Sequence, residues 1–316
     1  MKIVIAGGTG FIGQSMIKYF GEVNQVIVLT RNLPGQKTNA YGQHIDKSLY
    51  PKVQYLKWDG QTLDNWSKEL EKTDVLINLS GKSVNCRYTE KNKQEIISSR
   101  INSTKILGLA IQQCTEPPKL WINAGSATIY RDAYDHAQDE LTGEYKNDFS
   151  VQVCKLWEKM LFDQRTPFTR KIVLRMAITL GKGGVMKPYL NLIRIGLGGK
   201  QGTGKQMYSW IHIEETCRII EWLFANEELE GAFNCSSPEP ITNNHFMHVL
   251  RHNAGVPFGL PTPVWMLKMG ARLIGTETEL LLKSRWVIPT RLLNSGYHFK
   301  YLRLEDAVKN ILDDVS

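Results

Sequence analysis

Residues 1–13 read MKIVIAGGTGFIG, and this stretch decides the fold. The apolar run at positions 3–6 is too short for a helix and rich in β-branched residues, which is typical of a buried parallel strand. Glycines spaced three apart follow it and lead into a segment with helical apolar spacing. At such a turn the glycines permit a tight bend, close approach of a ligand and close helix–strand packing, and the first helical N–H groups face a diphosphate. We expect cofactor contacts from Gly7, Gly10, Phe11, Ile12 and Gly13.

Composition sets the broad class of protein. The chain has 316 residues, 42% of them hydrophobic, and a formal net charge of +8. No run of about twenty apolar residues is present, and the N-terminus enters the first strand without a signal-peptide pattern. Five scattered cysteines without a C-x-x-C pair indicate reduced thiols. We therefore expect a cytoplasmic protein that does not cross a membrane, with a basic surface that can draw an anionic ligand into a cleft.

Strand-like and helix-like segments alternate along most of the chain. This alternation predicts an α/β fold, a Rossmann-type doubly wound parallel sheet. We place the Rossmann domain at 1–253, with substrate-side insertions at about 181–213. A small C-terminal helical lobe at 254–316 is expected to close over the substrate end. The predicted strands are 3–6, 25–30, 53–58, 74–79, 120–124, 171–180 and 231–235.

The end of the second strand predicts the cofactor. In this fold an acidic residue there binds the ribose 2′-hydroxyl of NAD, and an arginine accommodates the 2′-phosphate of NADP. Here Thr30 and Arg31 occupy that place, so the sequence favours NADP(H) over NAD(H). An ordinary exposed arginine is the alternative interpretation of Arg31.

The glycine turn GGTGFIG resembles that of the extended short-chain dehydrogenase/reductases, and so do later motifs. Asn78-Leu79-Ser80-Gly81 resembles the N-L-A-G that the family places beside the cofactor, which implies cofactor contacts for Leu79, Ser80 and Gly81. The resemblance also implies that Asp59 binds adenine. Residues 125–130, GSATIY, resemble the segment after the fifth strand that supplies a catalytic Ser or Thr, here Ser126. A turn-capping hydroxyl is the alternative for Ser126.

The chain departs from the family at the catalytic helix. The family has Tyr and Lys four residues apart, and no tyrosine of this chain has a lysine four residues later. Lys155 stands at the position of the family's lysine, and Val151 stands where the family has the tyrosine. The resemblance implies that Lys155 binds the nicotinamide ribose and takes part in catalysis. An atypical subfamily of epimerase-family proteins shares this loss. This chain also resembles that subfamily in its other sequence motifs, which correspond here to Trp157-Glu158, GLGGKQGTGKQ at 196–206, SWIHI at 209–213 and residues 289–299 of the tail.

Another group must then supply the proton. Tyr130, four residues after Ser126, is the first candidate, with a packing aromatic as its alternative, and Tyr134 and His212 are weaker ones. His212 is otherwise a core or capping histidine. Arg175, on the sixth strand, is expected to line the substrate cleft, because strand ends do so in open α/β sheets. We assign Arg175 and His212 to the substrate side.

Three other patterns fail their structural requirements. Residues 199–206 nearly match a phosphate-binding P-loop, but Gln206 replaces the Ser or Thr, and no strand precedes the segment. His245, His248 and His252 share a helical face without a further ligand nearby, so we expect no metal. The basic segment 165–213 lacks the aromatic interleaving of nucleic-acid platforms.

Two classes of function remain. The first is an NADP(H)-dependent oxidoreductase or epimerase-like enzyme acting on a small, anionic or nucleotide-linked substrate. The second is a non-catalytic NADP(H)-binding regulator, which the missing tyrosine favours. Ser126 and Lys155 favour the enzyme. The sequence does not fix the substrate or the oligomeric state, and a homodimer is compatible with it.

Overall fold

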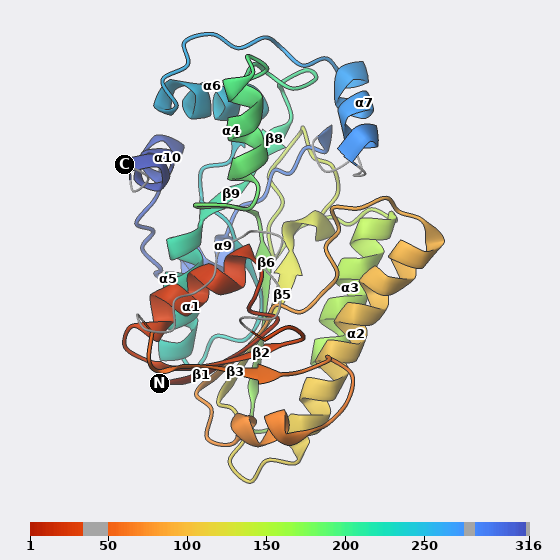
Figure 1. The fold of residues 1–316 in the computed structure, drawn as a ribbon, viewed down its shortest axis with the longest axis vertical. Coiled ribbons are helices and arrows are strands. Elements are labelled where there is room, and N and C mark those ends of the chain that lie inside the picture. Colours follow the sequence, from red (N-terminus) through yellow and green to blue (C-terminus); the bar gives the residue numbers. More distant parts are fainter. Residues whose placement is uncertain (34–49, 275–281, 314–316) are drawn as a thin grey trace.

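The fold is built on one parallel sheet (Figure 1). The computed structural model describes residues 1–33, 50–274 and 282–313. Within them a seven-stranded sheet reverses its strand order between β1 and β4, which creates a crevice at the carboxyl ends of the strands. In spatial order the strands are β10 (Gly231–Cys235), β6 (Arg170–Met176), β5 (Leu120–Ser126), β4 (Val75–Asn78), β1 (Lys2–Ala6), β2 (Gln25–Thr30) and β3 (Val53–Lys57).

Helices cover both faces of this sheet (Figure 1). On one face α1 (Phe11–Gly21) contacts α5 (Ile213–Ala225), and on the other α2 (Glu90–Gln112) contacts α3 (Phe149–Phe162). Alternate residues of β1 enter the two cores: Ile3 and Ile5 pack on the α1 side, whereas Val4 packs on the α2 side. A strand buried on both faces is therefore apolar throughout, which is why β1 could be recognised from sequence.

A second lobe packs around its own core. Its helices are α4 (Met186–Arg194), α6 (Asn243–Asn253) and α10 (Leu304–Asp313), and α7 (Val264–Ile274) lies at the same end of the molecule (Figure 1). In contrast, α9 (Thr290–Asn294) contacts β10 and packs on the core of the sheet domain through Leu292. Short strand pairs join it to the sheet domain: β7 (Ile178–Leu180) with β9 (Trp210–His212), and β8 (Met207–Tyr208) with β11 (Ile241–Thr242). The core of this second lobe contains residues from both sides of the domain boundary expected at 253/254. That boundary therefore stays a prediction.

The Rossmann-type sheet and a helical C-terminal region are confirmed, and one local expectation changes. The strand expected at 171–180 is divided into β6 and β7, because β7 leaves the main sheet to pair with β9. The segment after β3 forms the 3-10 helix η1 (Asn65–Leu70). In the described parts of the chain, no helix is long and apolar enough to cross a membrane.

Candidate functional site

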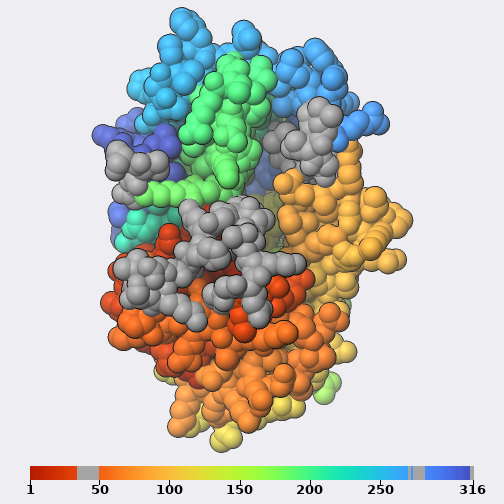
Figure 2. Space-filling view, in the orientation of Figure 1, coloured from red at the N-terminus to blue at the C-terminus, as the bar shows by residue number. Residues whose placement is uncertain are grey.

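A cavity of about 400 Å³ lies at the carboxyl ends of β1, β4 and β5. The glycine turn forms one wall, the loops after β4 and β5 form its floor, and α2 and α3 form the opposite wall. Figure 2 shows this face of the molecule, where a recess separates the green α4 region from the orange α2 region. The cavity therefore occupies the crevice in which open α/β sheets bind ligands.

The geometry of the glycine turn is suited to a dinucleotide. Gly7 has φ +76°, and a Cβ there would lie 2.8 Å from Oγ of Ser80. A Cβ on Gly13 would lie 2.5 Å from the backbone of Gly8. A Cβ on Gly10, in contrast, would meet nothing within 4 Å. Gly10 also caps α1 without a side-chain hydrogen bond, so the helix start is left to a ligand such as a phosphate. All five residues predicted from this turn line the cavity.

Of four other residues predicted to bind the cofactor, one lines the cavity and three do not. Leu79 lines the cavity, whereas Ser80 packs against Gly7. Arg31 is exposed, and Thr30 is buried, its hydroxyl donating to the backbone carbonyl of Asn32. Neither of these last two lines the cavity.

Asp59 and Gly81 have local partners. Hydrogen bonds from the backbone N–H and the hydroxyl of Thr62 hold the pKa of the exposed Asp59 carboxyl below its usual value, and the N–H of Gln61 donates to the same carboxyl. The Asp59 carboxylate thus closes a turn, and it does not line the cavity. Gly81 lies against Arg100: a Cβ would come 3.0 Å from Cζ of the guanidinium.

Two hydroxyl groups meet at the end of β5. Ser126 Oγ donates to Thr128 Oγ1 at 2.9 Å and accepts from the Thr128 N–H at 3.2 Å. Nε of Arg285 donates to the same Thr128 oxygen at 3.3 Å. Ser126 and Thr128 both line the cavity. Ser126 therefore lies in the cavity beside Thr128, which the sequence did not single out, and the catalytic role of Ser126 stays a prediction.

The catalytic helix α3 presents a different face from the one expected. The residues that line the cavity are Phe149, Ser150, Val153, Cys154 and Trp157. Val151 is buried outside the lining, and Lys155 is exposed with its ammonium 4.7 Å from the ring centroid of Tyr145. The expected placement of Lys155 is therefore corrected: successive helical residues turn by about 100°, and Lys155 lies on the exposed side of α3, whereas the preceding Cys154 lines the cavity. Ser150 and Cys154, also four apart, occupy the cavity face.

The cysteine on this face is un-ionised. Burial, aided by the nearby Glu158 carboxylate, raises the pKa of Cys154 to about 12. At neutral pH the group is thus a thiol, which can donate a weak hydrogen bond but does not replace a lysine cation.

Tyr130 and Arg175 lie in a buried polar cluster and do not line the cavity. The Tyr130 hydroxyl donates to Oδ1 of Asn234 at 3.0 Å and accepts from Nη1 of Arg175 at 2.7 Å. Two further hydrogen bonds of 2.8 Å join Arg175 to Glu158. Burial raises the pKa of Tyr130 well above its usual value. The structure therefore corrects the expected positions of Tyr130 and Arg175, since the cluster satisfies their polar groups.

The weaker candidates are also outside the cavity. His212 caps α5 by accepting the N–H of Glu214 on Nδ1, and its ring stacks on Tyr301 with centroids 4.0 Å apart. Its capping role matches the alternative interpretation. Tyr134 is 56% exposed.

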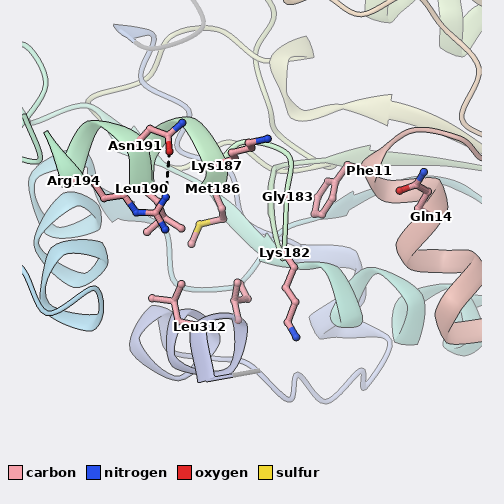
Figure 3. A pocket seen from close by; sticks show the side chains of 12 residues that line it. Phe11, Gln14, Lys182, Gly183, Met186, Lys187, Leu190, Asn191, Arg194 and Leu312 are labelled. Carbon is pink, nitrogen blue, oxygen red and sulfur yellow. Dashed lines mark hydrogen bonds between the residues drawn. The ribbon is translucent and has the colours of Figure 1, made fainter. Parts of the chain in front are cut away.

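A smaller cavity of about 270 Å³ lies behind the glycine turn (Figure 3). Met186 and Leu190 of α4 point toward Leu312 of α10, and Phe11 closes one end. Gly184 packs against the Phe11 ring and also lines the main cavity. Part of the insertion at 181–213 thus reaches the main cavity, where the sequence predicts a substrate-side segment.

Sequence reasoning missed Arg100, which lines the main cavity from α2. Its spacing carried a signal, because Ile96, Thr104 and Leu107 are buried at helical intervals from it. A charged residue on the buried face of a helix calls for a partner or a ligand.

The sheet, the glycine turn and the cavity define an α/β protein of the Rossmann type. The family model "NAD dependent epimerase/dehydratase family" matches residues 3–236, and a model for a domain of unknown function, DUF1731, matches residues 262–311. The chain belongs to the NAD-dependent epimerase/dehydratase family. Epimerase family protein YfhF of Bacillus subtilis is 31% identical over 99% of both chains. The mouse epimerase family protein SDR39U1 is 27% identical over 99% of this chain and 100% of its own.

A solved structure agrees with this membership. The human epimerase family protein SDR39U1, solved with NADPH, is similar at a TM-score of 0.84 and 26% identity, over 99% of this chain and 100% of that one. The resemblance to an atypical, epimerase-like subfamily with an added C-terminal region is thereby confirmed.

Proposed function

We propose that this chain is an NADP(H)-dependent oxidoreductase or epimerase-like enzyme with an altered catalytic set, acting on a small anionic or nucleotide-linked substrate. One observation carries the proposal: the glycine turn and the Ser126–Thr128 hydroxyl pair line the same cavity. The similar human protein was solved with NADPH, which supports a nicotinamide cofactor here.

The residues present fit such a cofactor. The uncapped start of α1 would hold the diphosphate, and Arg31 would bind the 2′-phosphate. When bound, the nicotinamide would supply hydride transfer. Ser126 and Thr128 would hold a substrate oxygen through hydroxyl hydrogen bonds, and Arg285 would polarise the Thr128 hydroxyl.

A non-catalytic NADP(H)-binding regulator is the second candidate. The observation that favours it lies on α3, where the cavity-facing positions carry Ser150 and Cys154 rather than tyrosine and lysine. Neither side chain is as strong a hydrogen-bond donor as the lost pair.

Binding and turnover separate these candidates. A charged hydrogen bond stabilises by about 1.5–3 kcal/mol, so we expect NADPH to bind about ten- to a hundredfold more tightly than NADH. Arg31→Ala should remove this preference, whereas Lys105→Ala, at an exposed position of α2, should retain it. Equal affinities for the two cofactors in the wild type would contradict the NADP assignment.

Loss of NADPH absorbance against a panel of carbonyl compounds and nucleotide sugars then tests the enzyme. Turnover of any member that depends on Ser126 supports catalysis. NADPH binding without turnover across the panel favours the regulator.

A further inference from the structure

Among the described residues that line the main cavity, Arg100 has the one formally charged side chain. The other groups on that wall are apolar or weakly polar, among them Tyr88, Phe149 and Val153. The Tyr88 and Phe149 rings meet edge to face with centroids 5.0 Å apart. A lone cation in such surroundings favours an anion, because charge–charge attraction grows as water is excluded.

Arg100 is held in place before any ligand arrives. Its Nη1 donates to the carbonyls of Lys82 and Ile96, each at 3.0 Å. Its Cζ lies 4.8 Å from the ring centroid of Trp157, and the missing side chain of Gly81 makes room on the backbone side. The Trp157 ring is itself fixed, since its Nε1 donates to Thr104 at 3.2 Å. A guanidinium oriented in this way loses little entropy when it binds a planar anion.

No carboxylate in the described parts of the chain forms an ion pair with Arg100. Glu158, one residue after Trp157, is paired with Arg175, and Glu95 is paired with Lys82. Burial lowers the pKa of Arg100, while the neighbouring Cys154 and Tyr88 oppose that shift only as weak acids. The guanidinium stays charged at neutral pH because its ordinary pKa is above 12.

We propose that Arg100 binds the carboxylate of the substrate, and that the substrate is a small monocarboxylic acid with a flat, apolar body. This inference rests on the proposed function. In the proposed function the cofactor's phosphates bind elsewhere, at the start of α1 and at Arg31. The anion at Arg100 therefore comes from the substrate. A nucleotide-linked substrate carries two further phosphates, for which the described residues on this wall of the cavity offer no second cation. The Trp157, Tyr88 and Phe149 rings would pack against the flat body.

Benzoate and its neutral isostere benzamide test the charge requirement. Calorimetric titration into the NADPH-loaded protein should show benzoate binding at least about tenfold more tightly than benzamide. Arg100→Gln should weaken benzoate about tenfold or more and remove this discrimination, with little change in NADPH affinity. Arg100→Lys should retain part of it, and Lys105→Gln, which removes an exposed charge from the same helix, should behave as wild type.

The outcomes distinguish this inference from the proposed function. The titrations are repeated without NADPH, and NADPH affinity is measured separately, so a failure of cofactor binding leaves the benzoate result readable. Equal binding of benzoate and benzamide, or no benzoate binding to the wild type, would overturn the inference. So would an Arg100→Gln variant that loses NADPH affinity about tenfold and leaves benzoate binding unchanged, because Arg100 would then serve the cofactor.

Discussion

Helix α3 borders two polar regions that use their side chains in opposite ways. One face, with Ser150 and Cys154, lines the cavity that Arg100 enters from α2. One turn further along, Glu158 enters the buried cluster with Arg175 and Tyr130. In the cluster the polar groups form hydrogen bonds and an ion pair with one another. The cavity, in contrast, holds the guanidinium of Arg100, which has no acidic partner among the described residues. A buried polar residue with a shifted pKa therefore indicates a ligand-binding site only when some of its hydrogen-bonding groups face an open cavity.

The largest expected effect comes from breaking the cluster's ion pair. Arg175→Met leaves Glu158 as an unpaired carboxylate whose side chain is 12% exposed, and should lower the free energy of unfolding by about 3–5 kcal/mol. Urea denaturation measures this change. Lys159→Ala, which removes an exposed pair with Asp163 on the same helix, should cost no more than about 1 kcal/mol. A stable Arg175→Met protein that has lost turnover would instead make Arg175 a substrate residue, as the sequence predicts.

A matched pair of hydroxyl deletions compares the two regions directly. Tyr130→Phe removes the hydroxyl that binds Nη1 of Arg175 and Oδ1 of Asn234, and leaves both groups without this partner. It should therefore destabilise the protein by about 1–3 kcal/mol and leave NADPH binding and turnover unchanged. Ser126→Ala should do the reverse: turnover should fall about 10²–10³-fold if Ser126 holds the reacting oxygen, with a smaller loss of stability. Denaturation curves and NADPH oxidation rates on both variants provide the measurements. A hundredfold slower Tyr130→Phe enzyme with wild-type stability would restore Tyr130 as proton donor.

The sheet and the glycine turn could be predicted because their causes are local. Apolar runs such as 3–6 and 26–29 are buried on both faces of the sheet, Gly7 has the positive φ that the turn requires, and Gly13 lies against the backbone of Gly8 within the same turn. The predicted turn residues accordingly lie in the cavity, and Ser126 follows from its place at the end of β5.

The rest of the site depends on contacts between distant segments. Packing against α2 and β5 decides which side of α3 is buried. The exposed position of Lys155 could not be predicted without knowledge of that packing. Tyr130 meets Asn234 across 104 positions of sequence, so its structural partner could not be read from neighbouring residues. The contact of Arg100 with Trp157 likewise joins two helices. The motif located the helix, but it did not identify which residues of the helix line the cavity.

The smallest expected effect concerns the start of α3, from which both regions are positioned. Asp148 caps this helix by accepting the Val151 N–H at 2.9 Å, and its other oxygen accepts from Lys283 at 2.9 Å. Burial alone would raise the pKa of Asp148, but these two hydrogen bonds outweigh it, so the pKa is below its usual value. A carboxyl with a depressed folded-state pKa contributes stability above its unfolded value of about 3.9, and that contribution is lost as pH falls through the folded value.

Asp148→Asn keeps an acceptor for the helix cap and removes the charge opposite Lys283. At pH 7 it should lower the free energy of unfolding by about 1 kcal/mol, less than either cluster variant because the Asp148 side chain is 28% exposed. The difference from wild type should shrink below about pH 4, as the wild-type carboxyl is protonated. Urea denaturation between pH 7 and pH 3 measures it, with Asp64→Asn, at the cap of η1, as the control. A deficit that stays constant over this range would show that the Lys283 pair contributes nothing, and that capping alone fixes the start of α3.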